Sequence, residues 1–217
     1  MVALDLTGHG AAPPLPAGAD SAALAGDVLA AARGLGLRAP LALVGHSLGG
    51  RVALRAAQQA PAQVRSVTLL DVGPGPLPGD GEIGRVLDAV LRAPATFASR
   101  GQARATLGAG GLAPALADWL LLNLEAAGAG YRWRVDRHAL ARLHARVAAE
   151  DLWPIAEGAR AWALSCVRGG ASRYVGDADA RRLEAAGARV VTVPEAGHFL
   201  HVEQPRAVLE AVGAALD

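Results

Sequence analysis

The sequence is poor in cysteine, lysine and aromatic side chains, and it has no long hydrophobic run. The single cysteine, Cys166, cannot form a disulfide within the chain, which favours a reducing cytoplasm, and its apolar neighbours favour packing in a core. The N-terminus lacks the basic start and apolar stretch of a secretory signal. Arg, Gly or Pro interrupts every apolar run before it reaches the roughly 18 residues that a membrane span requires. The sequence therefore predicts a cytoplasmic protein without a membrane span.

Charge of one sign is not concentrated anywhere in the chain. All 21 basic residues are arginines, 20 residues are acidic, and the formal net charge is +1. Because the arginines are spread along the chain, the sequence indicates no patch for nucleic acid or for a membrane surface. The 217 residues suffice for one domain with a full core, or for one domain that carries an insertion.

Short apolar runs alternate with helical patterns along the chain. The run at residues 41–44 precedes a helical pattern at 48–59, and a second run at 67–70 ends at Asp71. Strand, helix and strand in this order predict an α/β fold: a mostly parallel sheet flanked by helices, which binds ligands at the carboxyl ends of its strands. The alternation resumes after an interruption, at residues 162–167, 177–186, 189–193 and from Pro205 onward.

A long segment interrupts this alternation. Residues 72–81 are dense in Pro and Gly, and helical spacing without a convincing strand follows them. We therefore expect an α/β core formed by residues 1–76 and 159–217, with a helical cap inserted at residues 77–158.

The expected cap holds most of the aromatic side chains of the chain, namely Phe97, Trp119, Tyr131, Trp133 and Trp153. Side chains of this kind line a substrate pocket in some proteins, but more often they hold a helical segment together. Trp119 and Trp133 are the candidates for substrate contacts, and packing within the cap is the alternative for both.

A candidate nucleophile lies between the first strand and the first helix of the alternation. Gly45-His46-Ser47-Leu48-Gly49 has the pattern G-x-S-x-G, in which a strained turn presents the serine hydroxyl at the edge of a sheet. Such a turn needs small residues, and we expect Gly45 and Gly49 to provide the room. The amide of Leu48 would then donate to an oxyanion. The alternative is a Gly-rich packing turn without a catalytic role.

Three stretches, "DLTGHG", "GHSLGG" and "VPEAGHFLHVEQP", follow one another in an order and spacing that resemble an alpha/beta hydrolase over nearly the whole chain. The resemblance implies that Ser47 is the nucleophile and that His198, in a loop after the last strand, is the general base. An imidazole suits this role because it exchanges protons near neutral pH. His46 stands beside the nucleophile and is a further candidate for a substrate contact. His201 could form half of a metal pair with His198, but no cluster of Cys or carboxylates supports a metal site.

The acid of the catalytic triad is less plainly marked. Most alpha/beta hydrolases carry it in a pattern similar to G-x-x-D after the seventh strand, where "RGGASRYV" has Ser172 instead. The sequence resembles a subgroup of small esterases with G-x-x-S at this point, whose acid follows the sixth strand. That resemblance implies Asp71, which ends the strand after the nucleophile's strand, as the partner of His198. Asp177 or Asp179 is the alternative acid, and a role in capping a turn is the alternative for Asp71.

The resemblance also implies that strands are missing before residue 1. In the family, "DLTGHG" belongs to the fourth strand and the loop after it, and the third strand leads to a His-Gly loop with the second oxyanion donor. We therefore expect a strand at residues 2–5, and either an unpaired edge at residues 41–44 or pairing between these two segments. We expect Met1 to be an internal or misassigned start of a longer protein. The loss of one oxyanion donor typically lowers the rate about 10²- to 10³-fold.

The motifs and the resemblance together imply a serine hydrolase that cleaves carboxylic esters or thioesters of small or medium apolar acyl groups through an acyl-enzyme. Its partner would be a small-molecule substrate, and it would need neither a metal nor an organic cofactor. Two other classes of function stay open: a truncated, non-catalytic hydrolase-fold remnant or binding module, and a cofactor-free lyase, carbon–carbon hydrolase or perhydrolase on the same fold. The sequence indicates neither the natural substrate nor the oligomeric state.

Overall fold

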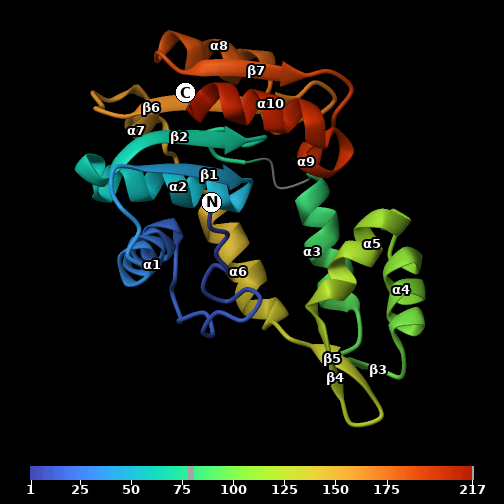
Figure 1. The fold of residues 1–217 in the computed structure, drawn as a ribbon. Helices are drawn as coiled ribbons and strands as arrows, with labels where there is room; N and C mark the ends of the chain where they lie inside the picture. Colours follow the sequence, from blue (N-terminus) through green and yellow to red (C-terminus); the bar gives the residue numbers. More distant parts are fainter. Residues whose placement is uncertain (78–80, 217) are drawn as a thin grey trace. The chain divides into compact units, whose positions relative to one another are not determined.

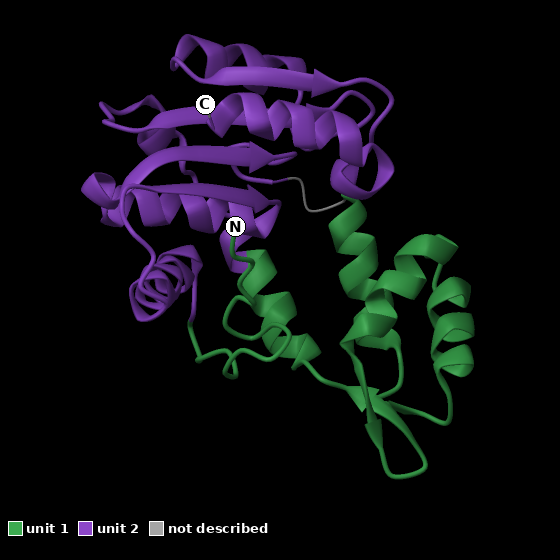
Figure 2. Ribbon diagram, viewed as in Figure 1, with its two compact units in different colours: residues 1–18, 79–145 green, residues 19–78, 146–217 purple. Residues whose placement is uncertain are grey.

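The computed structural model describes residues 1–77 and 81–216, and the chain forms two compact units (Figure 1, Figure 2). Unit 1 consists of residues 1–18 and 79–145, and unit 2 consists of residues 19–78 and 146–217. Residues 78–80, which belong to the Pro- and Gly-dense stretch, lie outside the described residues.

The boundaries of the units differ from the expected domain boundaries in three places, the smallest being residues 77–78, which were expected in the cap and are assigned to unit 2. Residues 1–18, expected in the α/β core, group with the inserted segment, and residues 146–158, expected in the cap, group with the sheet. Trp153 is one of these residues, and it packs in the core of unit 2 rather than among the aromatic side chains of the insertion. That the inserted segment acts as a cap stays a prediction.

Unit 2 is built on a parallel sheet whose described strands follow the order β1-β2-β6-β7 (Figure 1). The strands are β1 (Leu41–His46), β2 (Val64–Leu70), β6 (Ala163–Gly169) and β7 (Arg189–Val193). Every strand contains valine, leucine or both, and such side chains suit a pleated, partly buried surface. The prediction of an α/β fold with a parallel sheet is confirmed.

Helices cover both faces of this sheet. They are α1 (Ser21–Gly34), α2 (Leu48–Gln59), α7 (Trp153–Glu157), α8 (Asp177–Ala185), α9 (Leu200–Glu203) and α10 (Pro205–Leu216), with a 3-10 turn at Pro61–Gln63. Side chains of α2, α7 and α8 share one apolar cluster with the sheet, and side chains of α9 and α10 share another. The helix α1 begins where the Asp20 carboxylate accepts a hydrogen bond from the Ala23 amide at 2.9 Å, and it packs against α2.

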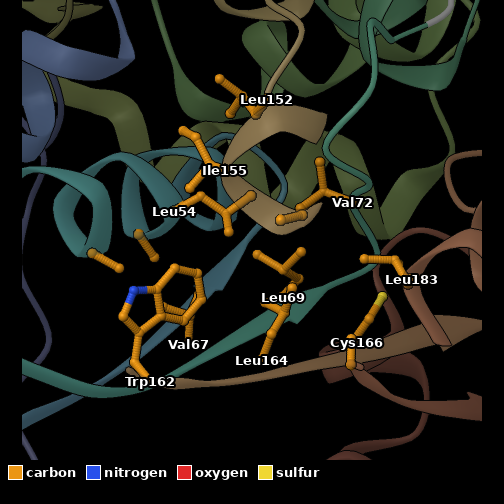
Figure 3. Close-up of a cluster of buried hydrophobic side chains, with 14 of the residues drawn as sticks. Leu54, Val67, Leu69, Val72, Leu152, Ile155, Trp162, Leu164, Cys166 and Leu183 are labelled. Atoms are coloured by element: carbon orange, nitrogen blue, oxygen red, sulfur yellow. The ribbon is translucent and has the colours of Figure 1, made fainter. Parts of the chain in front are cut away.

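The larger core of unit 2 lies between the sheet and the helices α2, α7 and α8 (Figure 3). It includes Leu54, Val67, Leu69, Ile155, Trp162, Leu164, Cys166 and Leu183. Cys166 is fully buried here, and burial raises the pKa of its thiol to about 12. The prediction that the cysteine packs in a core is therefore confirmed.

The strand β1 lies at the edge of the sheet, where β2 is its one partner among the described strands. Residues 1–6 form neither helix nor strand, so the predicted strand at residues 2–5 is wrong. Instead, the segment forms a loop that is closed by a hydrogen bond from the Ala11 amide to the Asp5 carboxylate at 2.9 Å. Of the two outcomes expected for residues 41–44, the structure shows the unpaired edge, and Val44 is 45% exposed.

Unit 1 contains helices and a small antiparallel sheet in the order β3-β5-β4. Its elements are α3 (Glu82–Arg92), β3 (Thr96–Phe97), α4 (Arg100–Ala109), α5 (Pro114–Leu120), a 3-10 turn (Leu121–Asn123), β4 (Leu124–Ala127), β5 (Gly130–Trp133) and most of α6 (Arg137–Ala148). The expectation of a purely helical insertion is therefore wrong. These strands span only 2 to 4 residues, too few for a visible alternation in the sequence.

The aromatic side chains of unit 1 contribute to its core. Phe97 is buried, and its ring meets that of Trp133 edge-on with 5.8 Å between the ring centres. The indole N–H of Trp133 donates to the Pro94 carbonyl at 2.9 Å. Both rings pack with the apolar cluster of the unit, as the packing alternative predicts, whereas Trp119 on α5 is 49% exposed. Within the described ranges, no helix of either unit is long and apolar enough to cross a membrane.

Candidate active site

Ser47 stands at the turn between β1 and α2. Its backbone φ of 51° is positive, which is uncommon for a residue with a side chain and marks a strained turn. A Cβ on Gly45 would lie 2.2 Å from the Gly49 backbone, and a Cβ on Gly50 would lie 2.6 Å from Val72. Gly45 therefore provides room as predicted, but a Cβ placed on Gly49 would meet no atom within 4 Å apart from its chain neighbours and the backbone of its own helix. The second glycine that the turn requires is Gly50, so the choice of Gly49 is wrong.

The hydroxyl of Ser47 is not used to hold the helix. Ser47 is the N-cap residue of α2, yet its side chain makes no capping hydrogen bond, while its amide donates to the Leu70 carbonyl at 3.1 Å. Leu48 is the first residue of α2, so its amide has no acceptor within the helix. Such an amide, at the positive end of a helix, suits the stabilisation of an oxyanion.

Asp71 and His198 come together at the carboxyl ends of the strands. Asp71 follows β2, His198 follows β7, and Nδ1 of His198 donates to Oδ2 of Asp71 at 2.8 Å. The side chains are 0% and 1% exposed. With Nδ1 as the donor, Nε2 is the ring nitrogen that accepts a proton, and no described residue hydrogen-bonds to it. The pair therefore has the arrangement of a general base and the acid that orients it.

Two further donors hold the Asp71 carboxylate. The Gly169 amide donates to Oδ1 at 2.8 Å, and the Ser172 hydroxyl donates to Oδ2. Ser172 stands at the position where most alpha/beta hydrolases carry the acid, and here its hydroxyl donates to Asp71, the candidate acid. The alternative acids lie elsewhere: Asp177 forms an ion pair with Arg168 and has a 75% exposed side chain, and Asp179 stands in the first turn of α8.

Aromatic rings enclose the imidazole of His198. The ring centre of Tyr174 lies 4.0 Å from that of His198, and Phe199 meets it edge-on at 5.3 Å. The sequence pattern does not mark Tyr174, which stands two residues after Ser172 and whose amide donates to the Ser172 hydroxyl at 3.2 Å. Ser172, Tyr174 and Phe199 therefore pack around His198 and Asp71.

The buried Arg51 connects the helix α2, which follows Ser47, to the segment that follows Asp71. One guanidinium nitrogen donates to the carbonyls of Gly73 and Gly75 at 2.9 and 2.7 Å, and the other donates to the Glu150 carbonyl. Burial lowers the pKa of Arg51 to about 10. Sequence analysis did not single out this residue, because its partners are backbone groups distant along the chain.

The remaining residues that the sequence analysis considered for the site are His46, Trp119, Trp133 and His201. His46 is half-buried and gives its Nε2 hydrogen to the His198 carbonyl at 2.8 Å. Trp119 and Trp133 belong to unit 1, so their role as substrate contacts stays a prediction. His201 packs against His46, and the described residues include no group of three or more His, Cys, Asp or Glu that could hold a metal ion.

A cavity of about 600 Å³ in unit 2 lies at the opposite edge of the sheet. Its walls include Ala163 and Arg189, which begin β6 and β7, and the side chains of Arg160 and Trp162. None of the triad residues lines it. Because ligands of α/β sheets bind at the carboxyl ends of the strands, this cavity is not the candidate active site.

Comparisons with known proteins agree with the fold and the motifs. The alpha/beta hydrolase family matches residues 1–211. The sn-1-specific diacylglycerol lipase ABHD11 of Mus musculus is 30% identical over 226 residues, which cover 100% of this chain and 71% of that protein. Among solved structures, a marine microorganism esterase has a TM-score of 0.85 at 21% identity, with 97% of this chain and 82% of that chain covered. E-2-(acetamidomethylene)succinate hydrolase has a TM-score of 0.79 at 26% identity, with 98% and 80% covered.

The chain belongs to the alpha/beta hydrolase family. The family match extends over both units and includes the strained serine turn and the buried histidine–aspartate pair. The protein is accordingly an enzyme of the hydrolase class.

Proposed function

We propose that the protein is a serine hydrolase that cleaves carboxylic esters or thioesters of small or medium apolar acyl groups. The observation that carries the proposal is the buried pair of His198 and Asp71, with 2.8 Å between Nδ1 and Oδ2, on the same sheet edge as the strained turn of Ser47. A serine at such a turn and an oriented imidazole are the parts that nucleophilic acyl transfer requires.

In the proposed mechanism, Oγ of Ser47 attacks the acyl carbon while Nε2 of His198 takes the hydroxyl proton. The carbonyl oxygen becomes an oxyanion, to which the Leu48 amide donates. The bond to the leaving alcohol or thiol then breaks, and His198 returns the proton to it. Water adds to the acyl-enzyme through the same base, releasing the carboxylic acid and restoring Ser47. Asp71 keeps the hydrogen on Nδ1 throughout and stabilises the imidazolium.

The substrate class is supported by the relatives. The curated relative acts, by its name, on diacylglycerol at the sn-1 position, which is an ester bond. Two of the similar structures are named as an esterase and as a hydrolase of a succinate derivative. A carboxylic ester or thioester shares with these substrates an acyl carbon that a serine can attack.

The test is hydrolysis of p-nitrophenyl butyrate and butyryl-coenzyme A by the wild-type chain, by Ser47→Ala and by the control Ser99→Ala. Ser99 caps α4 in unit 1 and is not one of the residues to which the proposed mechanism assigns a role. We expect turnover by the wild type and Ser99→Ala, and a loss of about 10³-fold or more in Ser47→Ala.

Two outcomes would favour other functions. A folded wild-type chain that neither turns over esters nor reacts with a fluorophosphonate would be a non-catalytic hydrolase-fold protein or a binding module. A chain whose Ser47 reacts with the fluorophosphonate, while no ester or thioester is hydrolysed, would favour lyase, carbon–carbon hydrolase or perhydrolase chemistry.

A further inference from the structure

His46 connects the strand of the nucleophile to the loop of the base. It is the last residue of β1 and directly precedes Ser47. Its Nε2 lies 2.8 Å from the carbonyl oxygen of His198. Because a carbonyl oxygen only accepts, Nε2 of His46 carries the hydrogen and donates it.

The loop that carries His198 is held from three directions. The Ala171 amide donates to the Ala196 carbonyl at 2.9 Å, and Glu203 accepts a hydrogen bond from the Gly197 amide at 2.6 Å. These two contacts come from the segment after β6 and from α9. The hydrogen bond of His46 comes from the strand that leads directly to Ser47.

The surroundings of His46 keep its imidazole neutral. Its ring centre lies 4.6 Å from that of His198 and 4.5 Å from that of His201, with Phe199 at 5.8 Å. Burial, and then the neighbouring His198, lower the pKa of His46 to about 4. The charged groups of the surroundings, Asp71 and Glu203, are already engaged with His198 Nδ1 and the Gly197 amide.

We propose that His46 is a positioning residue for the general base: its Nε2 hydrogen fixes the backbone of His198 so that the imidazole stays on Asp71 with Nε2 presented to Ser47. This inference rests on the proposed function, because it assigns His198 as the base. The ring hydrogen of His46 is donated to the His198 carbonyl, and the expected role of His46 as a substrate contact stays a prediction.

The test compares His46→Gln with His46→Asn. The amide nitrogen of Gln reaches the position of Nε2, whereas that of Asn, one methylene shorter, reaches only the position of Nδ1. We expect Gln to keep kcat within about 5-fold of the wild type and Asn to lower kcat about 10- to 100-fold with KM within about 3-fold, since the His198 carbonyl then loses its donor. His46→Phe, which keeps a ring without the donor, should behave as Asn does. His138→Asn, the same change at an exposed histidine of α6, should leave kcat unchanged.

A second measurement does not depend on turnover. The proton NMR signal of the His198 Nδ1–H, bound to Asp71, should exchange with water faster in His46→Asn and His46→Phe than in the wild type and His46→Gln. Equal kcat and equal exchange in all variants would overturn the inference, as would a loss in Gln as large as that in Asn. If the folded wild type shows no turnover, the proposed function fails, and the exchange rates still decide whether His46 holds His198. If His46→Asn or His46→Phe does not fold, the other of the two is compared with His46→Gln, and if His46→Gln does not fold, the wild type is the chain that keeps the donor.

Discussion

At the residue scale, the proposed chemistry of the site depends on contacts between groups that are far apart in the sequence. Ser47 and Asp71 are candidates in the sequence because each stands at the end of a recognisable strand and because the stretches around them resemble those of alpha/beta hydrolases, and their catalytic roles stay predictions. The sequence pattern did not show that Ser172 donates to Asp71 or that Tyr174 lies 4.0 Å from the imidazole of His198. These contacts depend on how the loops after β6 and β7 fold, and hydrophobic periodicity carries no information on loop geometry.

The assignment of Asp71 can be tested by removing its charge. Asp71→Asn places an amide beside Nδ1 of His198 and favours the ring tautomer with the hydrogen on Nε2, which cannot take the proton of Ser47. Serine proteases lose about 10⁴-fold of kcat on the corresponding change, and we expect a loss of about 10³- to 10⁴-fold in ester hydrolysis. The matched control is Asp177→Asn, which removes an exposed carboxylate paired with Arg168 and should change kcat no more than about 2-fold. A larger loss in the control than in Asp71→Asn would move the acid to Asp177.

At the scale of elements, long and regular patterns predicted the structure well. The helix at residues 48–59 and the strand at 189–193 were expected with the bounds that α2 and β7 have. The strands of unit 1 could not be predicted, because each is short and gains its stability from its neighbours rather than from its own pattern. Residues 2–5 show the opposite case, an apolar run that forms no strand. An apolar run forms a strand only where a partner strand pairs with it.

The edge strand β1 gives a prediction about association between molecules. An unpaired edge with an exposed apolar side chain is a template for pairing with another chain, and a charge on it opposes this. We expect Val44→Lys to lower concentration-dependent light scattering relative to the wild type. Leu209→Lys is the control, because Leu209 is 67% exposed but stands on the helix α10. Equal scattering by the wild type and Val44→Lys, or an equal decrease in both variants, would argue against association through this edge.

At the scale of the whole molecule, histidines link stability to pH, because burial lowers the pKa of His9, His46, His144 and His201. Burial lowers the pKa of His46 in unit 2 and of His144 in unit 1 to about 4, from an ordinary value of 6.5. The sequence pattern does not indicate the burial of His144, because spacing alone does not show which side of α6 is covered. Below pH 6.5 the unfolded chain binds protons at these positions, and the folded chain does not. The free energy of unfolding therefore decreases as the pH falls from 6.5 towards 4.

The pH prediction is measured by urea unfolding at pH 7 and pH 5. The urea midpoint of the wild type should fall between the two values, and in His144→Gln it should fall less, because one of the linked groups is absent. His138→Gln removes an exposed histidine of the same helix and should keep the decrease seen in the wild type. A midpoint that does not change with pH, or that changes equally in all three chains, would contradict the linkage.

The central claim is that Ser47 is a nucleophile activated by His198 and Asp71. Its most direct test is mass spectrometry of tryptic peptides after reaction with a fluorophosphonate, which bonds covalently to activated serines. The account predicts the adduct on the peptide that contains Ser47 in the wild type, and little or none of it in Asp71→Asn under the same conditions. A folded wild-type chain that gains no adduct, or gains it on another serine, would contradict the account.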